Sequence, residues 1–328
     1  MVQHFQVKPV PIGQTPFECA LPLRRRFFPL GFPVDLETNS PDVIDAAQEV
    51  WRYCSQTFEE TPVRIALAVS DSATVPATLK SEFRGRAHLM SVVADPENFM
   101  VCDFARALAA GWITSAVAAD HPFLRYRFLT CASHMLIAQL ALAPVHAALI
   151  SRQGRGVVLC GESFSGKSTL AYACARAGFT YITDDGTHLV RQRRDRFAIG
   201  DAHTIRLRED ARELFPELAN RLAIVRPNGK IAIEMFTKDL PIQIATGCSI
   251  DHVVFLDRRG HSDPRLRVYP HERALEVLEA CASYGAEEVR AAQKRSYAKL
   301  LGASTWELSY SHFDDAVTRL EQLVDSGD

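Results

Sequence analysis

The chain has 328 residues, of which 47% are hydrophobic and 23% are charged, and its formal net charge is −2. These values are typical of a folded globular protein that is long enough for two domains. Because they provide no global basic field, they argue against nucleic acid or an anionic membrane as the partner.

The eight cysteines lie far apart and form no C-x-x-C pair. Most of them stand inside apolar runs such as VVLC at 157–160. This pattern favours reduced, buried thiols in a cytoplasmic protein over a disulfide framework or a zinc site. The opening residues, MVQHFQVKPVPIGQTPF, lack the apolar core of a secretory signal.

The first part of the chain, residues 1–143, is predicted to form an N-terminal α+β domain. Residues 1–40 have no clear periodicity, and a helix is expected over 40–58, with Ser40 as its cap and Pro41 at its first position. Strands at 63–69, 87–93 and 99–104 and a long helix at 123–143 follow. Because this part contains no catalytic motif, we assign it substrate or partner recognition, or an oligomer contact.

One apolar stretch, CASHMLIAQLALAPVHAALI at 131–150, resembles a transmembrane segment. It contains His134, Gln139, Pro144 and His146, which a spanning helix rarely carries together. We therefore predict a buried helix that ends before Pro144, then a strand, and no membrane partner.

The second part, residues 144–328, is predicted to be an α/β nucleotide-binding domain with a mixed sheet. The expected strands are 145–151, 157–160, 179–183, 231–236 and 251–257, with a hairpin around the polar turn at 193–195. Helices are expected at 168–176, where Gly178 is the C-cap, and at 271–284, 286–300 and 312–325.

A phosphate-binding loop is the clearest motif, because residues 161–168 match G-x-x-x-x-G-K-[ST]. In this Walker A pattern the backbone N–H groups surround phosphate oxygens, the lysine reaches the β- and γ-phosphates, and the final hydroxyl binds Mg²⁺. The expected nucleotide ligands are Gly161, Glu162, Ser163, Phe164, Ser165, Gly166, Lys167, Ser168 and Thr169. An ordinary strand–turn–helix corner is the alternative, but the apolar strand before the loop and the helix after it favour nucleotide.

Two adjacent carboxylates, Asp184 and Asp185, end the strand that follows the loop helix. One of them is suited to the Mg²⁺ shell, together with Ser168, and the other to taking a proton from an attacking hydroxyl. A simple turn is the competing interpretation, since Asp-Asp-Gly is common after a strand.

The stretch from VHAALIS to YITDD resembles the core of the HPr kinase/phosphorylase family, which is related to phosphoenolpyruvate carboxykinases. The resemblance covers about 40 residues, and His146, Gly161, Lys167, Ser168 and Asp185 fall at matching offsets. It implies that Asp185 is the catalytic base, that Asp184 assists at the metal or the proton, and that His146 lies near the phosphates. A satisfied core histidine is an equally good interpretation of His146.

The sequence departs from that family at 200–225, where the glycine-rich signature is absent. We therefore do not infer HPr as substrate, phosphorylase activity or a hexamer, although a homo-oligomer stays open. Second-tier candidates are Glu209, Asp210 and Glu234 as ligands or anchors, Arg206 and Arg208 for phosphate or carboxylate, and Arg258 and Arg259 for nucleotide; each is also compatible with a solvated position.

These features predict an ATP-dependent, Mg²⁺-requiring kinase that phosphorylates a hydroxyl of a peptide, protein or small molecule, serine being one candidate. A nucleotide-binding regulatory protein that transfers no phosphate is the alternative. A P-loop ATPase coupled to movement is a third interpretation, disfavoured because no apolar run ending in Asp-Glu follows the loop.

Overall fold

A computed structural model describes residues 19–76, 81–226, 229–258 and 264–326. The chain forms two compact units, and it passes from the first to the second between Leu140 and Ala141. Short segments at 226–230 and 284–286 belong to the first unit. Pro144, where the sequence predicted the boundary, lies inside strand β8 (Leu142–Arg152) of the second unit.

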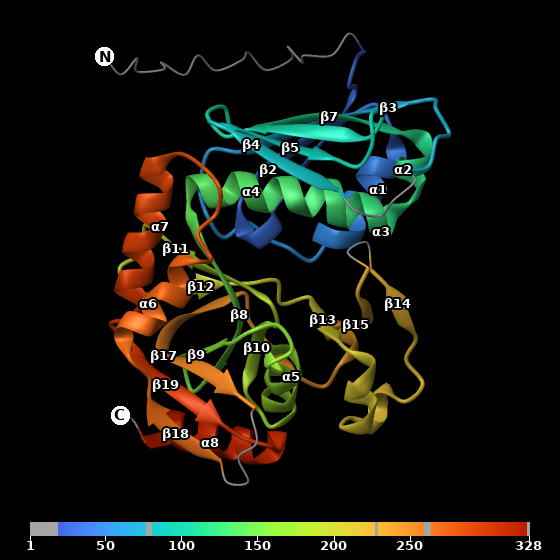
Figure 1. Cartoon of the computed structure of the whole chain (residues 1–328). Helices are drawn as coiled ribbons and strands as arrows, with labels where there is room; N and C mark the ends of the chain where they lie inside the picture. Colours follow the sequence, from blue (N-terminus) through green and yellow to red (C-terminus); the bar gives the residue numbers. More distant parts are fainter. Residues whose placement is uncertain (1–18, 77–80, 227–228, 259–263, 327–328) are drawn as a thin grey trace, which may run out of the picture. The chain divides into compact units, whose positions relative to one another are not determined.

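The first unit is a seven-stranded mixed sheet in the order β1-β2-β3-β7-β6-β5-β4, with its helices on one face (Figure 1). The β2–β3 and β3–β7 pairs are parallel and the others are antiparallel. The strands are β1 (Leu23–Phe27), β2 (Val34–Thr38), β3 (Val63–Ser70), β4 (Glu82–Arg86), β5 (Leu89–Val93), β6 (Phe99–Asp103) and β7 (Leu108–Thr114). The helices are η1 (Pro29–Gly31), α1 (Pro41–Trp51), α2 (Ser115–Ala119), α3 (His121–Leu124), η2 (Arg125–Thr130) and α4 (Cys131–Leu140).

Two helix predictions in this unit need correction. Helix α1 ends at Trp51 instead of continuing to 58. The expected helix at 123–143 is divided into α3, a π-helical segment η2 and α4, and its last residues already belong to strand β8. The change from helix to strand before Pro144 is as predicted, and within the described residues no helix combines the length and apolar character needed to cross a membrane.

The second unit is built on a nine-stranded mixed sheet in the order β16-β10-β8-β11-β12-β17-β19-β18, in which β9 pairs with both β8 and β17. A separate three-stranded sheet has the order β13-β15-β14. The strands after β8 are β9 (Arg155–Cys160), β10 (Thr180–Thr183), β11 (Gly186–Val190), β12 (Phe197–Ile199), β13 (Thr204–Leu207), β14 (Ala223–Val225), β15 (Ile231–Phe236), β16 (Gln243–Ile244), β17 (Gly247–Asp257), β18 (Arg265–Val268) and β19 (Ser304–Ser309).

Two apolar cores hold the second unit together. One contains residues of α5 (Lys167–Arg176), α8 (Phe313–Ser326) and the three-stranded sheet, and the other contains residues of α6 (His271–Glu279) and α7 (Glu287–Leu300). The short helices are η3 (Glu209–Glu213), η4 (Pro216–Leu218) and η5 (Thr237–Asp239). Burial of these apolar side chains is the main stabilising contribution to the unit, and it fixes α5 against the sheet.

Candidate nucleotide and phosphoryl-transfer site

Strand register brings the loop and the two aspartates to the same point of strand β8. Ala147 pairs with Cys160, the residue before the glycine loop, and His146 pairs with Gly186, the residue after Asp185. The start of the glycine loop and the segment that follows Asp185 therefore lie on either side of residues 146–147, although they are separated in the sequence. All the elements of this site belong to the second unit.

The loop between β9 and α5 is curled, with two residues in the left-handed region of backbone space. Gly166 has φ of 91° and Phe164 has φ of 73°. A Cβ at Gly166 would lie 3.2–3.3 Å from Tyr310, Arg258 and Phe313. Only glycine avoids both the backbone strain and this crowding, which explains why Gly166 stands directly before α5.

The Lys167 side chain is buried and folds back over the loop. Its Nζ donates to the carbonyl oxygens of Gly161 at 2.8 Å and Glu162 at 3.0 Å. These bonds hold the ammonium group against the loop, where it would offset the negative charge of a phosphate bound there. A buried ammonium group with carbonyl acceptors next to a glycine-rich loop is chemically compatible with an anionic ligand.

The rest of the loop also fits a phosphate. Glu162, Ser163 and Phe164 are exposed, whereas Ser165 Oγ is buried and, among the described residues, has no hydrogen-bond partner. Thr169 is half-buried on the first turn of α5. A buried hydroxyl without a partner beside the helix N-terminus is a donor available to phosphate oxygens.

Ser168 and Asp184 connect the loop to the end of β10. Ser168 Oγ donates to the Asp184 carbonyl oxygen at 3.3 Å. The Asp184 side chain is buried; its Oδ2 accepts from the Arg206 backbone N–H at 3.1 Å, and its Oδ1 lies 3.3 Å from the Tyr181 hydroxyl. A hydroxyl and a carboxylate are ligands suited to Mg²⁺, which keeps several waters and takes substrate phosphate oxygens for the rest.

Burial raises the pKa of Asp184 from its usual 3.8 to about 6. The positive charge of Arg206 opposes this shift, and the neighbouring Asp185 reinforces it. Asp184 is therefore a carboxylate whose negative charge is incompletely compensated, which favours a cation beside it.

Asp185 and His146 lie together at the solvent-exposed side of the site. His146 Nε2 is 3.2 Å from Asp185 Oδ1, and the two side chains are 53% and 62% exposed. The histidine is therefore not a core residue. Exposure leaves Asp185 accessible to a hydroxyl from another molecule, while Asp184, at 3% exposure, is not.

The second-tier candidates have different surroundings. Arg206 pairs with Glu234 at 3.1 Å across the β13–β15 register, and Glu209 pairs with Arg212 at 3.0 Å. Arg208 lies over the exposed Phe164 ring, with its guanidinium carbon 4.8 Å from the ring centroid. Arg259 is outside the described residues.

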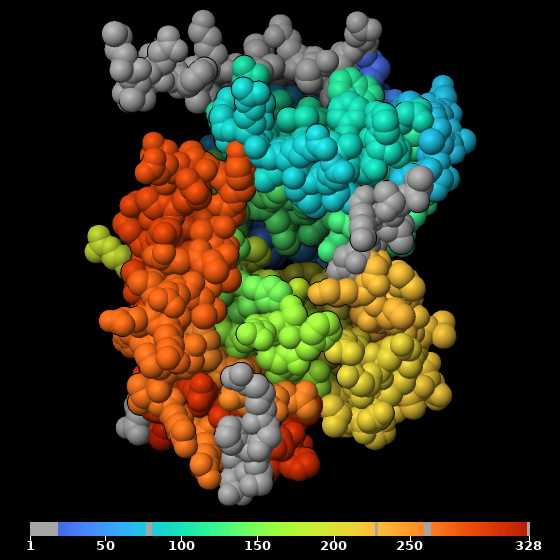
Figure 2. All heavy atoms as spheres, in the orientation of Figure 1, coloured from blue at the N-terminus to red at the C-terminus, as the bar shows by residue number. Residues whose placement is uncertain are grey.

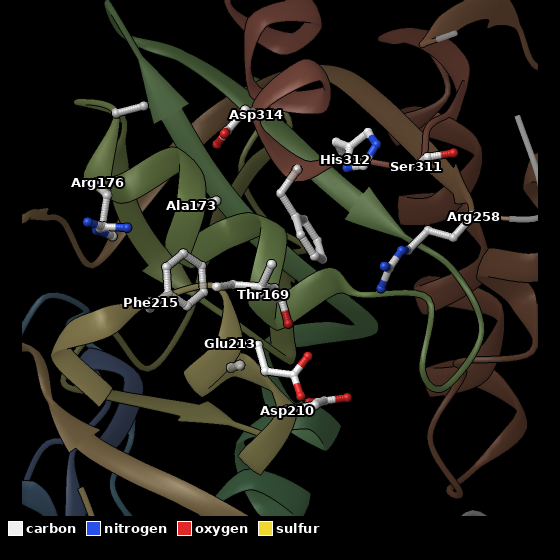
Figure 3. A pocket seen from close by; sticks show the side chains of 14 residues that line it. Thr169, Ala173, Arg176, Asp210, Glu213, Phe215, Arg258, Ser311, His312 and Asp314 are labelled. Atoms are coloured by element: carbon white, nitrogen blue, oxygen red, sulfur yellow. The ribbon is translucent and has the colours of Figure 1, made fainter. Parts of the chain in front are cut away.

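A cavity of about 560 Å³ lies beside helix α5 (Figure 3). Its lining residues come from α5 and the residue after it, from the segment 210–215, from the residue after β17, and from the start of α8 with the two residues before it. They are Thr169, Ala173, Arg176, Ala177, Asp210, Ala211, Glu213, Leu214, Phe215, Arg258, Ser311, His312, Phe313 and Asp314. Thr169 is both the last residue of the predicted ligand set and part of this lining.

No family model and no curated protein matches this sequence. Among solved structures, the chain is similar to the Hpr(Ser) kinase/phosphatase from Coxiella burnetii, with 13% sequence identity and a TM-score of 0.28. The match covers 55% of this chain and 96% of that one.

Sequence reasoning missed the residues that hold Asp184, namely Tyr181 and the backbone of Arg206. The only available signal was the polar end of the strand at 179–183, because contacts with β13 depend on tertiary structure. The strand expected at 251–257 is confirmed as the last part of β17, which ends at Asp257, but its parallel pairing with β9 was not predicted. Asp257 is followed by Arg258 and not by the glutamate expected of a motor-type ATPase.

Proposed function

We propose that the chain is an ATP-dependent, Mg²⁺-requiring kinase that transfers the γ-phosphate of ATP to a hydroxyl of a peptide, protein or small molecule, with serine as one candidate acceptor. The observation that carries the proposal is the exposed Asp185–His146 pair at 3.2 Å, held beside the glycine loop by the register of β8. A loop that only binds nucleotide has no need for an accessible carboxylate at this position.

Each residue has a defined task in this proposal. Lys167 and the loop N–H groups hold the β- and γ-phosphates, and Ser168 and Asp184 hold Mg²⁺, which neutralises charge on the phosphate oxygens when bound. Asp185 accepts the proton of the acceptor hydroxyl as that oxygen bonds to the γ-phosphorus and the bond to the ADP oxygen breaks. His146 orients the Asp185 carboxylate and stabilises it. HPr is not proposed as the acceptor.

The decisive experiment compares wild type with Asp185→Asn. The purified proteins are incubated with Mg²⁺, γ-labelled ATP and cell lysate separated into small-molecule, peptide and protein fractions. Because a general base contributes roughly 10²–10⁴-fold, Asp185→Asn should reduce label transfer by at least about a hundredfold while leaving ATP affinity within a few-fold. Label in one fraction with wild type alone identifies the acceptor class.

Two results would count against the proposal. Transfer by Asp185→Asn within a few-fold of wild type would show that Asp185 is not the base. Tight ATP binding by wild type with no labelled fraction would favour a regulatory protein that binds nucleotide without transferring phosphate.

A further inference from the structure

The cavity beside α5 is placed and shaped to continue a ligand that begins in the glycine loop. Thr169, Ala173 and Ala177 line it at four-residue spacing along one face of the helix region. At 1.5 Å per residue this row extends about 12 Å away from the loop. Because Thr169 directly follows Ser168, phosphates held in the loop lie at one end of the row.

The cavity lining also includes two aromatic rings and the two arginines that lie over them. Phe215 and Phe313 are rings in the lining, and the Arg258 guanidinium carbon lies 4.7 Å from the Phe313 ring centroid. Arg176 is stacked over Phe215 at 5.3 Å and is paired with Glu217 at 3.0 Å. Figure 3 shows Phe215 beside the α5 wall and Arg258 on the opposite side. The two rings are themselves buried, at 4% and 8% exposure, so the exposed planar groups suited to stacking on a nucleobase are the guanidinium groups of Arg176 and Arg258.

Three carboxylates complete the lining: Asp210, Glu213 and Asp314. Ionised carboxylates only accept hydrogen bonds, so they match ligand groups that donate them. Ribose hydroxyls and the exocyclic amino groups of bases are such donors, and acidic residues bind ribose hydroxyls in other nucleotide sites.

His146 and Asp185 do not line this cavity. The acceptor hydroxyl therefore needs a different approach to the γ-phosphate, and the cavity is left for the other end of the nucleotide. Its volume, about 560 Å³, is within the range of roughly 300–1,000 Å³ that is usual for small-molecule sites.

We infer that this cavity holds the ribose and base of the nucleoside triphosphate, with Arg258 lying at the junction between the loop and the nucleoside. The inference rests on the proposed function, in that both place a triphosphate in the loop. It adds that binding strength comes from the nucleoside as well as from the phosphates, and that the base is one carrying an amino group.

Equilibrium binding of ATP and of inorganic tripolyphosphate, each with Mg²⁺, tests this inference on the full chain by calorimetry. The variants are Ala173→Phe, which fills the middle of the cavity, and Ala177→Trp, which starts from an exposed residue at its far end. Ala298→Trp, at an exposed position on α7, is the matched control. We expect each cavity variant to weaken ATP binding at least tenfold and to change tripolyphosphate binding less than twofold. The control variant should change the binding of neither ligand.

The inference would be overturned if wild type bound tripolyphosphate as tightly as ATP, or if both cavity variants bound ATP normally. It would also be overturned if the cavity variants weakened the binding of ATP and of tripolyphosphate equally. If Ala173→Phe fails to fold, Ala177→Trp alone decides, because its side chain extends from an exposed position. UTP, whose base has no amino group, should bind more weakly than ATP and GTP. None of these binding measurements requires phosphoryl transfer, so they can be interpreted even if the protein proves not to be a kinase. Likewise, the transfer experiment can succeed even if the nucleoside binds outside this cavity.

Discussion

At the scale of single residues, Asp184 and Asp185 are neighbours in sequence with opposite environments. Asp184 is buried between Tyr181 and the backbone of Arg206, whereas the Asp185 side chain is 62% exposed beside His146. In the proposed function the two carboxylates therefore have different tasks: the buried Asp184 would hold the metal, and the exposed Asp185 would take the proton of the acceptor hydroxyl. Sequence position alone predicted the pair but did not distinguish the two environments.

The raised pKa of Asp184 predicts a specific dependence of stability on pH. Since burial raises this pKa from 3.8 to about 6, the folded state binds the proton more tightly than the unfolded state between these values. Stability should therefore fall as pH rises from about 4 to about 6, by roughly 2–3 kcal/mol from this group, and then stay level. Asp184→Asn should remove this contribution, so that the variant is more stable than wild type near pH 7.

Urea unfolding of wild type and Asp184→Asn at several pH values between 4 and 8 measures this effect. The same variant should bind Mg²⁺–ATP more weakly, because a neutral amide is a poorer metal ligand than a carboxylate. A difference in unfolding free energy between the two proteins that is constant across this range would contradict the assigned pKa.

Lys167 gives a second prediction at this scale. Removing its ammonium in Lys167→Ala should weaken ATP binding roughly ten- to a hundredfold, because hydrogen bonds to charged groups contribute about 1.5–3 kcal/mol. Tripolyphosphate should be affected as strongly as ATP, since in the proposed site the lysine binds the phosphates and not the nucleoside. Calorimetric titration with both ligands checks this, and a loss restricted to ATP would place Lys167 elsewhere in the site.

At the scale of elements, the sequence was most informative where a local signal sets the structure. The strand, glycine loop and helix over 155–176 and the hairpin of β11 and β12 form as expected, because turn residues and apolar runs mark their ends. Strands β1, β2, β4, β7, β13, β14, β16, β18 and β19 were missed. Six of them, β2, β7, β13, β16, β18 and β19, pair with strands that are distant in the sequence, which a local signal does not reveal. Strand 251–257, expected to be the last, is followed by β18 and β19.

The turn at Gly166 allows backbone strain and crowding to be separated. Gly166 and Gly154 both have positive φ, at 91° and 81°, but only Gly166 has neighbours at the position of an added Cβ. Gly154→Ala should cost about 1–2 kcal/mol of stability from the backbone alone and leave ATP binding unchanged. Gly166→Ala should cost more and also weaken ATP binding, because Tyr310, Arg258 and Phe313 have to move. Equal unfolding free energies for the two variants would argue against the crowding.

At the scale of the whole molecule, the proposed nucleotide site lies entirely in the second unit. The site depends on pairing between strands that are distant in the sequence as well as on the loop motif. Strand β8 pairs with β9 and β10, and β9 pairs with β17. The strands of the first unit carry no catalytic motif in their sequence. Its buried thiols nevertheless make its stability measurable separately.

Buried cysteines in each unit report on the opening of that unit. Cys102 lies in the first unit and Cys160 and Cys174 in the second; all three are buried, and burial raises the pKa of each thiol, to about 12 for Cys160. They should react with a thiol reagent only when the surrounding structure opens. Because a ligand stabilises only the state that binds it, Mg²⁺–ATP at a hundred times its dissociation constant should slow labelling of Cys174 by about a hundredfold.

Cys102 should be labelled at the same rate with and without nucleotide if the two units open independently. Mass spectrometry of the labelled peptides measures both rates in one sample, and exposed Cys19 provides an internal standard that should react rapidly in either case. Equal protection of Cys102 and Cys174 would show instead that the units open together as one cooperative structure. Protection of Cys102 alone would mean that the nucleotide binds to the first unit, which would contradict the site proposed beside α5.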